Sequence, residues 1–382
     1  MSASPEALRE GKGRIASLDG LRALSIGMVL FAHVCGTRYF VSLVALRRDL
    51  GNVGVRVFFV ISGFLITTLL LQEFTATKTI SLKMFYLRRT FRIFPCAYTY
   101  ILVMFLLYWS GLVALAPHDF MHAATYTVNY ERVRPWYLIH LWSLSVEEQF
   151  YFIWPAILLF LRPRRGLWFA ASVLVLAPLA RFGMWYLTPD LRWNIGTGFQ
   201  TNADALAAGC VLAGIRTWLW AQPAYLRFQK SRAFLLVPVL AALGAALLYA
   251  SRPPLLLVSC LIGQTVLNIA IALLIDWCVR HHASPFGRFL NWKPMVFVGV
   301  LSYSLYLWQE PFLYRLSDAV INRFPLNLSL AFLAAIASYY LVERPFLSLR
   351  RRLENRLAHP RPAMHLHARA AATDAFVESE AD

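Results

Sequence analysis

Long apolar segments recur along this 382-residue chain and constrain its fold more than any other feature. They run for roughly 18–22 residues, the length that an α-helix needs to cross a bilayer. Only 15% of the residues are charged and the mean hydropathy is +0.54, whereas about a quarter of a soluble domain is charged. The pattern predicts an all-α polytopic membrane protein.

We expect about ten transmembrane helices with mostly short connections. The ten segments are 18–36, 53–72, 95–115, 141–161, 167–187, 203–220, 233–250, 254–278, 294–314 and 327–346. Basic residues concentrate in alternate connections, as at Arg88 and Arg89 before the third segment, and again after the tenth. Because cytoplasmic connections are rich in lysine and arginine, both termini are predicted to be cytoplasmic.

The chain divides into three parts on this topology. Residues 1–17 form a cytoplasmic N-terminal segment, residues 18–349 the transmembrane domain, and residues 350–382 a basic, then disordered, cytoplasmic tail that becomes rich in alanine, histidine and acids from about Asn355. The net charge of +17 lies at the ends of apolar segments, which indicates a lipid bilayer partner and no nucleic acid. The five cysteines are scattered, so we expect neither a metal site nor a disulfide framework.

Ionisable residues inside the first segment are the strongest sign of function. Arg22 and His33 are eleven positions apart, nearly on one helix face and roughly 16 Å apart along the axis. Asp19 lies one turn before Arg22 on the same face. Charged groups in a membrane helix are costly and mark functional sites. At that spacing, the side chains of Arg22 and His33 should not contact each other. They should lie at different depths along one passage across the membrane.

Glu147 and Glu148 lie in the fourth segment, at a predicted depth similar to that of His33. A histidine with a carboxylate beside it can act as a base with its orienting partner. We therefore predict that Glu147 partners His33, with Glu148 and Tyr151 as candidate lining residues. The alternative is a buried ion pair that only fixes helix packing, although so many charges within spans favour function.

A basic cluster, Arg88, Arg89 and Arg92, opens the third segment. Arg88 and Arg92 are one turn apart and can share a face. Guanidinium groups bind phosphates in a bidentate manner, so a phosphate site is available. On charge alone, an anchor that touches lipid headgroups is the favoured interpretation.

Four further polar residues have two interpretations each. Asp204 stands near the start of the sixth segment, where it either caps a helix or lines a site. Tyr303 and Tyr306 form a polar stripe on the ninth segment with Gln309. Such a stripe either lines a cavity or hydrogen-bonds a neighbouring helix.

Taken together, the motifs resemble the acyltransferase-3 family of integral membrane O-acyltransferases. The resemblance covers residues from about 17 to 349. Its motifs are Arg22 with His33, Phe58–Leu65, Tyr86–Arg89 with Arg92–Pro95, His140–Tyr151, Ser302–Trp308 and Glu343–Phe346. Two positions depart from the family pattern. Gln309 follows the tryptophan where many relatives have histidine, and Asn202 stands where the family has an arginine.

The resemblance implies a carbohydrate O-acetyltransferase-like enzyme of the inner (cytoplasmic) membrane. It implies acyl-CoA (acetyl-CoA) as co-substrate, no permanently bound cofactor, and a carbohydrate or glycolipid acceptor. It makes His33 the catalytic base or acyl relay. It implies that Arg88, Arg89 and Arg92 bind the CoA phosphates, and that Arg22 binds the donor deeper in the membrane.

Two other function classes remain open at this stage. One is a proton-coupled transporter, because charged residues within membrane spans also mark ion paths. The inverted repeats that are typical of transporters are not visible in the sequence. The other is a non-catalytic component of polysaccharide assembly.

Overall fold

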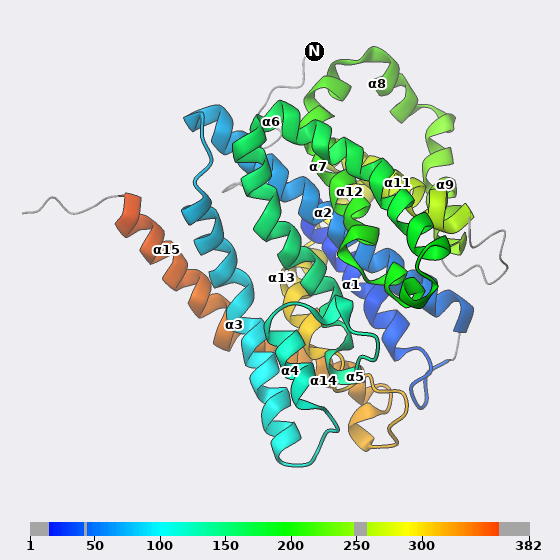
Figure 1. Cartoon of the computed structure of the whole chain (residues 1–382), viewed down its shortest axis with the longest axis vertical. Helices are drawn as coiled ribbons and strands as arrows, with labels where there is room; N and C mark the ends of the chain where they lie inside the picture. Colours follow the sequence, from blue (N-terminus) through cyan, green and yellow to red (C-terminus); the bar gives the residue numbers. More distant parts are fainter. Residues whose placement is uncertain (1–14, 42–43, 248–257, 359–382) are drawn as a thin grey trace, which may run out of the picture.

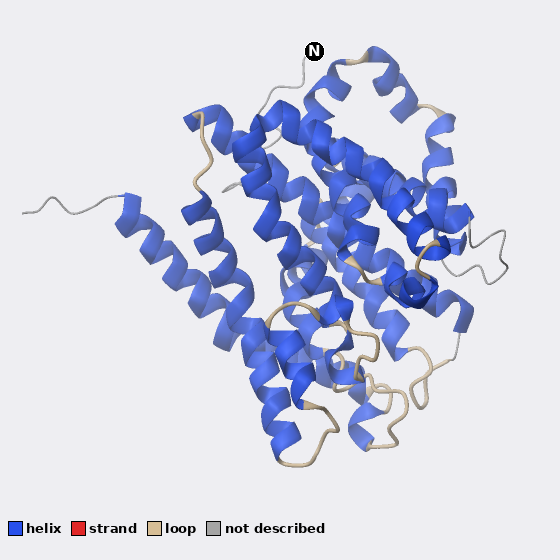
Figure 2. Ribbon diagram, in the orientation of Figure 1, coloured by secondary structure: helices blue, strands red, loops and turns tan. Residues whose placement is uncertain are grey.

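The structure, a computed structural model, describes residues 15–41, 44–247 and 258–358. All regular secondary structure in these ranges is helical, as Figure 2 shows. The expected all-α class is therefore confirmed for the described residues. Most of the N-terminal segment, the start of the expected segment 254–278 and the end of the tail lie outside them.

The helices follow one another with few long connections (Figure 1). In chain order they are α1 (Leu18–Val34), α2 (Val44–Thr77), α3 (Leu82–Trp109), α4 (Pro117–Ala124), η2 (Val128–Tyr130), α5 (Trp136–Ile139), α6 (Leu141–Tyr186), η3 (Pro189–Gly196), α7 (Phe199–Ala221), α8 (Pro223–Lys230), η4 (Arg232–Leu235), α9 (Leu236–Leu247), η5 (Ser259–Gly263), α11 (Gln264–Arg280), α12 (Pro285–Leu290), α13 (Lys293–Trp308), η6 (Val320–Asn322), α14 (Leu326–Ser338), η7 (Tyr339–Glu343) and α15 (Arg344–Ala358).

Helices α1 and α2 form the centre of the bundle. Helix α1 packs between α2 and α13, while α2 also packs against α7. Helix α3 lies on one flank with α15 beside it (Figure 1). This arrangement brings the polar faces of α1, α2, α3, α6 and α13 toward one another, and those faces carry most of the residues singled out above.

The crossing of α2 and α7 depends on two glycines. A Cβ atom at Gly63 would collide with the backbone of Leu206, and one at Gly209 would collide with the backbone of Val60. Small residues allow membrane helices to approach this closely. The crossing fixes the face of α2 that carries Ser62.

Helix α6 is two helices joined at a sharp bend. Arg162 has φ 62° and ψ 158°, outside the helical region, and Pro163 follows it. Gly166, after the bend, packs against Leu158 before it, so the two arms fold back on each other (Figure 1). The bend falls between the fourth and fifth expected segments, where the sequence predicts a connection.

Four described helices are long and apolar enough to cross a membrane: Leu50–Thr77, Leu82–Trp109, Trp136–Tyr186 and Leu326–Arg356. A fifth span is formed if the pair Pro223–Lys230 and Arg232–Ala246, bent by 70°, counts as one.

Helix α15 continues through Asn355 to Ala358, past the point where the sequence predicts disorder to begin. The ion pair between Glu354 and Arg88 of α3, at 3.0 Å, accounts for part of this extra order.

Candidate functional site

Two adjoining pockets lie among the central helices. The first, the arginine pocket, is a cavity of about 100 Å³ whose polar lining is Arg22, Ser62, Arg89, Arg92, Ser143, Glu147, Tyr151, Ser302, Tyr303 and Tyr306. The second, the histidine pocket, is a cavity of about 310 Å³ whose polar and aromatic lining is His33, Asn52, Trp136, His140, Trp142, Tyr306, Glu310 and Arg315. Val55 and Tyr306 line both pockets. The two cavities are therefore neighbours, with Arg22 in one and His33 in the other.

The arginine pocket brings together three guanidinium groups from two helices. Arg22 comes from α1, and Arg89 and Arg92 lie one turn apart on α3. Arg22 donates to Asp19 at 3.2 Å, as the sequence spacing predicts. The guanidinium of Arg89 lies 5.0 Å from the ring centre of Tyr151, which is a cation–π contact. Three cations around one cavity suit a polyanionic ligand such as a phosphate ester.

Glu147 lies in the arginine pocket within a short hydrogen-bond chain. Its carboxylate accepts from the hydroxyl of Ser62 at 2.6 Å, and Ser62 accepts from the hydroxyl of Tyr151 at 3.0 Å. These two hydrogen bonds link α6 to the face of α2 that the glycine crossing fixes. Glu147 is therefore held on the arginine side of the paired cavities.

The histidine pocket contains a buried carboxylate between two imidazoles. Nδ1 of His33 is 3.4 Å from Oε1 of Glu310, and Nδ1 of His140 is 4.0 Å from the same oxygen. The Glu310 side chain is 0% exposed and that of His140 1%, whereas that of His33 is 24% exposed. His33 is thus the member of this group that a substrate can reach.

Aromatic side chains hold this histidine–carboxylate group in place. Nε1 of Trp136, on α5, donates to the backbone carbonyl of Glu310 at 2.8 Å, and its ring centre lies 5.7 Å from that of His33. The hydroxyl of Tyr306 donates to the backbone carbonyl of His140 at 2.8 Å. These two hydrogen bonds therefore fix the backbone of Glu310 and of His140, the two residues that share this group with His33.

A family model matches most of the chain. The family described as an acyltransferase domain (acyltransferase-3) matches residues 15–344. The chain belongs to the acyltransferase-3 family. Its membership confirms the resemblance that the sequence motifs carry.

Curated relatives share this region at low identity. An O-acetyltransferase OatA of Staphylococcus aureus is 28% identical over 369 residues, which are 87% of this chain and 57% of the relative. A peptidoglycan O-acetyltransferase OatA of Listeria monocytogenes is 28% identical over 370 residues, which are 88% of this chain and 55% of the relative. The chain thus spans just over half the length of the curated relatives it matches. No solved structure matches it.

The carboxylate beside His33 is Glu310 and not Glu147, which corrects the predicted pairing for this acyltransferase-3 chain. Helix α6 begins at Leu141, so it is His140 that lies at the level of His33. Glu147 follows two turns later, about 10 Å further along α6, and reaches the level of Arg22. Glu310 follows α13 in the Trp308–Pro311 stretch, where the sequence departs from the family pattern. An acidic residue at the end of an apolar segment is the signal that could have indicated it.

The basic cluster of α3 divides between two faces. Arg89 and Arg92 line the arginine pocket, whereas Arg88 pairs with Glu354 of α15 and does not line it. The expected joint phosphate site of Arg88 and Arg92 is therefore wrong. Residues three and four positions before Arg92 can both share its face, and the carboxylate of α15 binds the side chain of Arg88 away from the pocket. Arg88 is half-exposed and lines neither pocket.

Asp204 is neither a helix cap nor a lining residue of the two pockets. Helix α7 begins at Phe199, so Asp204 lies inside its second turn. Its carboxylate accepts from Arg181 at 3.0 Å and from the hydroxyl of Thr265 at 2.6 Å, and the Asp204 and Arg181 side chains are both 0% exposed. This buried ion pair joins α6, α7 and α11.

The remaining predicted lining residues are distributed among three cavities. Tyr303 and Tyr306 both line the arginine pocket, and Tyr303 donates to the backbone carbonyl of Ile93 at 2.7 Å. Glu148 lines a third cavity of about 340 Å³ with Gln149. Arg89 and Tyr151 line both this third cavity and the arginine pocket. Glu148 thus lies on the far side of Arg89 from Glu147.

Proposed function

We propose that this chain is an integral membrane O-acyltransferase that moves an acyl group, most simply acetyl, from acyl-CoA to a hydroxyl of a carbohydrate. The observation that carries the proposal is the contact between His33 and buried Glu310 in a pocket that adjoins three arginines. An anion-binding cavity next to a histidine–carboxylate pair matches what acyl transfer from a CoA thioester requires.

The donor would bind with its phosphates in the arginine pocket. Arg89 and Arg92 supply the guanidinium forks, and Arg22 lies with them. The pantetheine arm would then extend past Val55 and Tyr306, which border both pockets. The helical rise between Arg22 and His33, roughly 16 Å, is the distance that this arm has to bridge.

The chemical step assigns one proton transfer to His33. Its imidazole takes the proton from the acceptor hydroxyl as the oxygen attacks the thioester carbonyl. A carbon–oxygen bond forms, the carbon–sulfur bond breaks, and the CoA thiolate leaves and takes the proton from the imidazolium. Glu310 orients the ring and stabilises its cation, in the role that the sequence assigns to Glu147. Glu147 remains a candidate for positioning the donor through Ser62.

The acceptor class follows from the relatives. One matching relative is named a peptidoglycan O-acetyltransferase, so we propose a surface glycan or a glycolipid as acceptor here. The open side of the histidine pocket, where His33 is partly exposed, is the place where its hydroxyl would enter.

We also propose a ten-span topology in the inner membrane with both termini cytoplasmic. The bend at Arg162 makes two spans of α6, and the shorter helices α1, α11 and α13 of 17, 17 and 16 residues overlap the first, eighth and ninth expected segments. The basic ends of the apolar segments support this orientation. It puts Arg22 toward the cytoplasmic donor and His33 toward the outer side.

The decisive experiment compares His33→Ala with wild-type protein in membranes supplied with labelled acetyl-CoA. Positioned base catalysis contributes about 10²–10⁴-fold, so we expect transfer to the glycan acceptor to fall by at least 100-fold while insertion is unchanged. His281→Ala is the matched control, because His281 lies at the end of α11 and lines neither pocket. Near-normal transfer by His33→Ala would overturn the assignment, and protein without acetyl-CoA-dependent transfer would favour the transporter hypothesis.

A further inference from the structure

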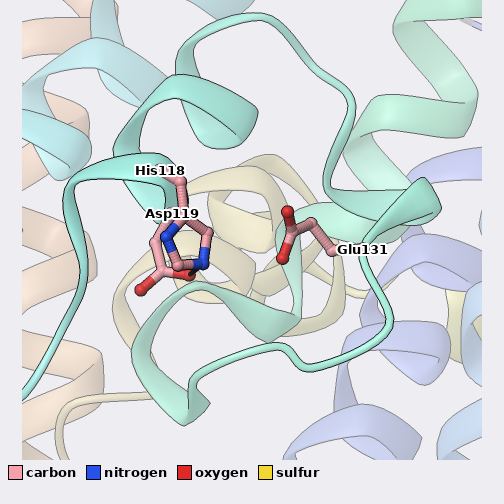
Figure 3. Close-up of side chains that lie close together, drawn as sticks. All are labelled: His118, Asp119 and Glu131. Carbon is pink, nitrogen blue, oxygen red and sulfur yellow. Dashed lines mark ion pairs between the residues drawn. The ribbon is translucent and has the colours of Figure 1, made fainter.

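A histidine and two carboxylates that line neither pocket come together in the connection between α3 and α6. Donor atoms of His118, Asp119 and Glu131 all lie within 4.8 Å of one another. Figure 3 shows His118 and Asp119 at the start of α4, facing Glu131 from the segment that follows η2. The scattered cysteines predict no metal site, and these three residues are a different set of potential ligands.

The two carboxylates are each held by one hydrogen bond from the chain itself. The backbone N–H of Ala116 donates to Oδ2 of Asp119 at 2.7 Å, while Oδ1 of the same carboxylate lies 3.5 Å from Nε2 of His118. Nε2 of His122 lies 2.6 Å from Oε1 of Glu131. Hydrogen bonds of this kind orient the ligands of metal sites.

His122 is itself fixed by a second contact. Its Nδ1 lies 2.8 Å from the hydroxyl of Thr127, which points Nε2 at Glu131. Asp119 is buried, at 7% exposed, and Glu131 is half-buried, at 15% exposed, whereas His118 is 60% exposed. The two carboxylates are thus held in place, and the exposed imidazole is free to rotate toward an ion that the three donors share.

We propose that His118, Asp119 and Glu131 bind a divalent transition-metal ion, with zinc as the best-fitting ion. Imidazole and carboxylate together suit Zn²⁺, at about 2.0–2.2 Å from each donor, whereas Mg²⁺ and Ca²⁺ prefer oxygen ligands alone. Three protein ligands leave one position for water. The ion does not enter the acyl-transfer step.

The ion's place in the fold indicates a structural role. It joins the start of α4 to the segment after η2, and the turn between them, Thr125–Thr127, lines the third cavity beside Glu148 and Arg89. Gln149 of α6 already holds the far end of this turn through Tyr126 and Asn129. A metal bound by His118, Asp119 and Glu131 would hold the other end of the turn. The connection between α3 and α6 would then be held in place at both ends, over the third cavity.

The test uses the full chain, purified in detergent, stripped with chelator and titrated with Zn²⁺ against a chromophoric competitor. We expect one Zn²⁺ per chain by elemental analysis and a higher unfolding temperature with Zn²⁺ than without it. His118→Ala and Glu131→Gln should each weaken binding by at least about 10-fold, since even outer partners of a metal site are worth about 10–100-fold. His122→Asn should weaken it by about 10-fold through the orientation of Glu131.

The controls are His282→Ala and Asp190→Asn, which remove the same chemical groups elsewhere and should leave the affinity unchanged. Glu131→Gln preserves the shape of the side chain, so a loss of binding there does not reflect misfolding. Failure of the wild-type chain to retain Zn²⁺, or equal retention by His118→Ala and Glu131→Gln, would overturn the proposal. Mg²⁺ that raises the unfolding temperature as much as Zn²⁺ does would overturn the choice of ion.

Discussion

The arginine and histidine pockets are neighbours with opposite charge chemistry. One gathers three guanidinium groups around a small cavity, and the other buries a single carboxylate between two imidazoles. In the proposed function, the first arrangement would hold an anion, whereas the second would hold or move a proton. Helix α1 serves both, through Arg22 at one end and His33 at the other. Binding and chemistry are therefore separated along one helix and can be perturbed one at a time.

The largest expected effect distinguishes the role of Glu310 from that of Glu147. Glu310→Gln keeps the shape of the side chain and removes its charge beside His33. The substitution removes the carboxylate charge that lies 3.4 Å from the imidazole. Because each loss of about 1.36 kcal/mol of transition-state stabilisation is a factor of ten, we expect kcat for acetyl transfer to fall by about 10- to 100-fold. The Michaelis constant for acetyl-CoA should hardly change, because Glu310 lies outside the arginine pocket.

Glu147→Gln is the matched comparison for that experiment. It alters the arginine pocket and should act mainly on the Michaelis constant for acetyl-CoA. A larger loss of kcat in Glu147→Gln than in Glu310→Gln would return the orienting role to Glu147 and contradict the separation of the pockets.

The next effect tests the donor side. Arg89→Ala removes one of three cations from the arginine pocket and should raise the Michaelis constant for acetyl-CoA by about 10-fold with a smaller change in kcat. Arg88→Ala is its control on the same helix, because Arg88 faces Glu354. Equal effects of the two substitutions in steady-state kinetics would mean that the cluster acts as a general basic surface.

The smallest effect examines the link between α2 and α6. Ser62→Ala breaks the chain from Tyr151 to Glu147. A hydrogen bond between such groups contributes about 0.5–1.5 kcal/mol net, so kcat/KM should drop by roughly 3-fold. A loss beyond about 100-fold, measured in the same transfer assay, would place Ser62 in the chemistry and not only in the support of Glu147.

The sequence predicted the all-α class because apolar segments of helical length recur along it. Against the ten expected spans, four described helices, or five if the bent pair counts as one span, are long and apolar enough to cross a membrane. The sequence also predicted that Arg22 and His33 belong to different places, since their separation follows from helical rise alone. The polar partners were harder to predict. The contact of His33 with Glu310 depends on where α6 starts and how α13 ends, and neither is visible in a single segment.

Two further residues show the same limit. Asp204 was ambiguous because its partner, Arg181, is 23 positions away on another helix. The direction of Arg88 was missed because any two residues one turn apart can share a face, and only the position of α15 decides which face is used. Local pattern predicts elements, whereas pairings between helices require their relative rotation.

The glycine crossing of α2 and α7 has a consequence for the order of biosynthesis. Gly63 and Leu206 are separated by 143 positions, so α2 leaves the ribosome long before its partner. At about 5–20 residues per second, the Ser62 face of α2 waits for roughly 7–28 seconds without the helix that fixes it. Assembly of the arginine pocket is therefore a late event, and a chain truncated before α7 would insert its first helices without completing the site.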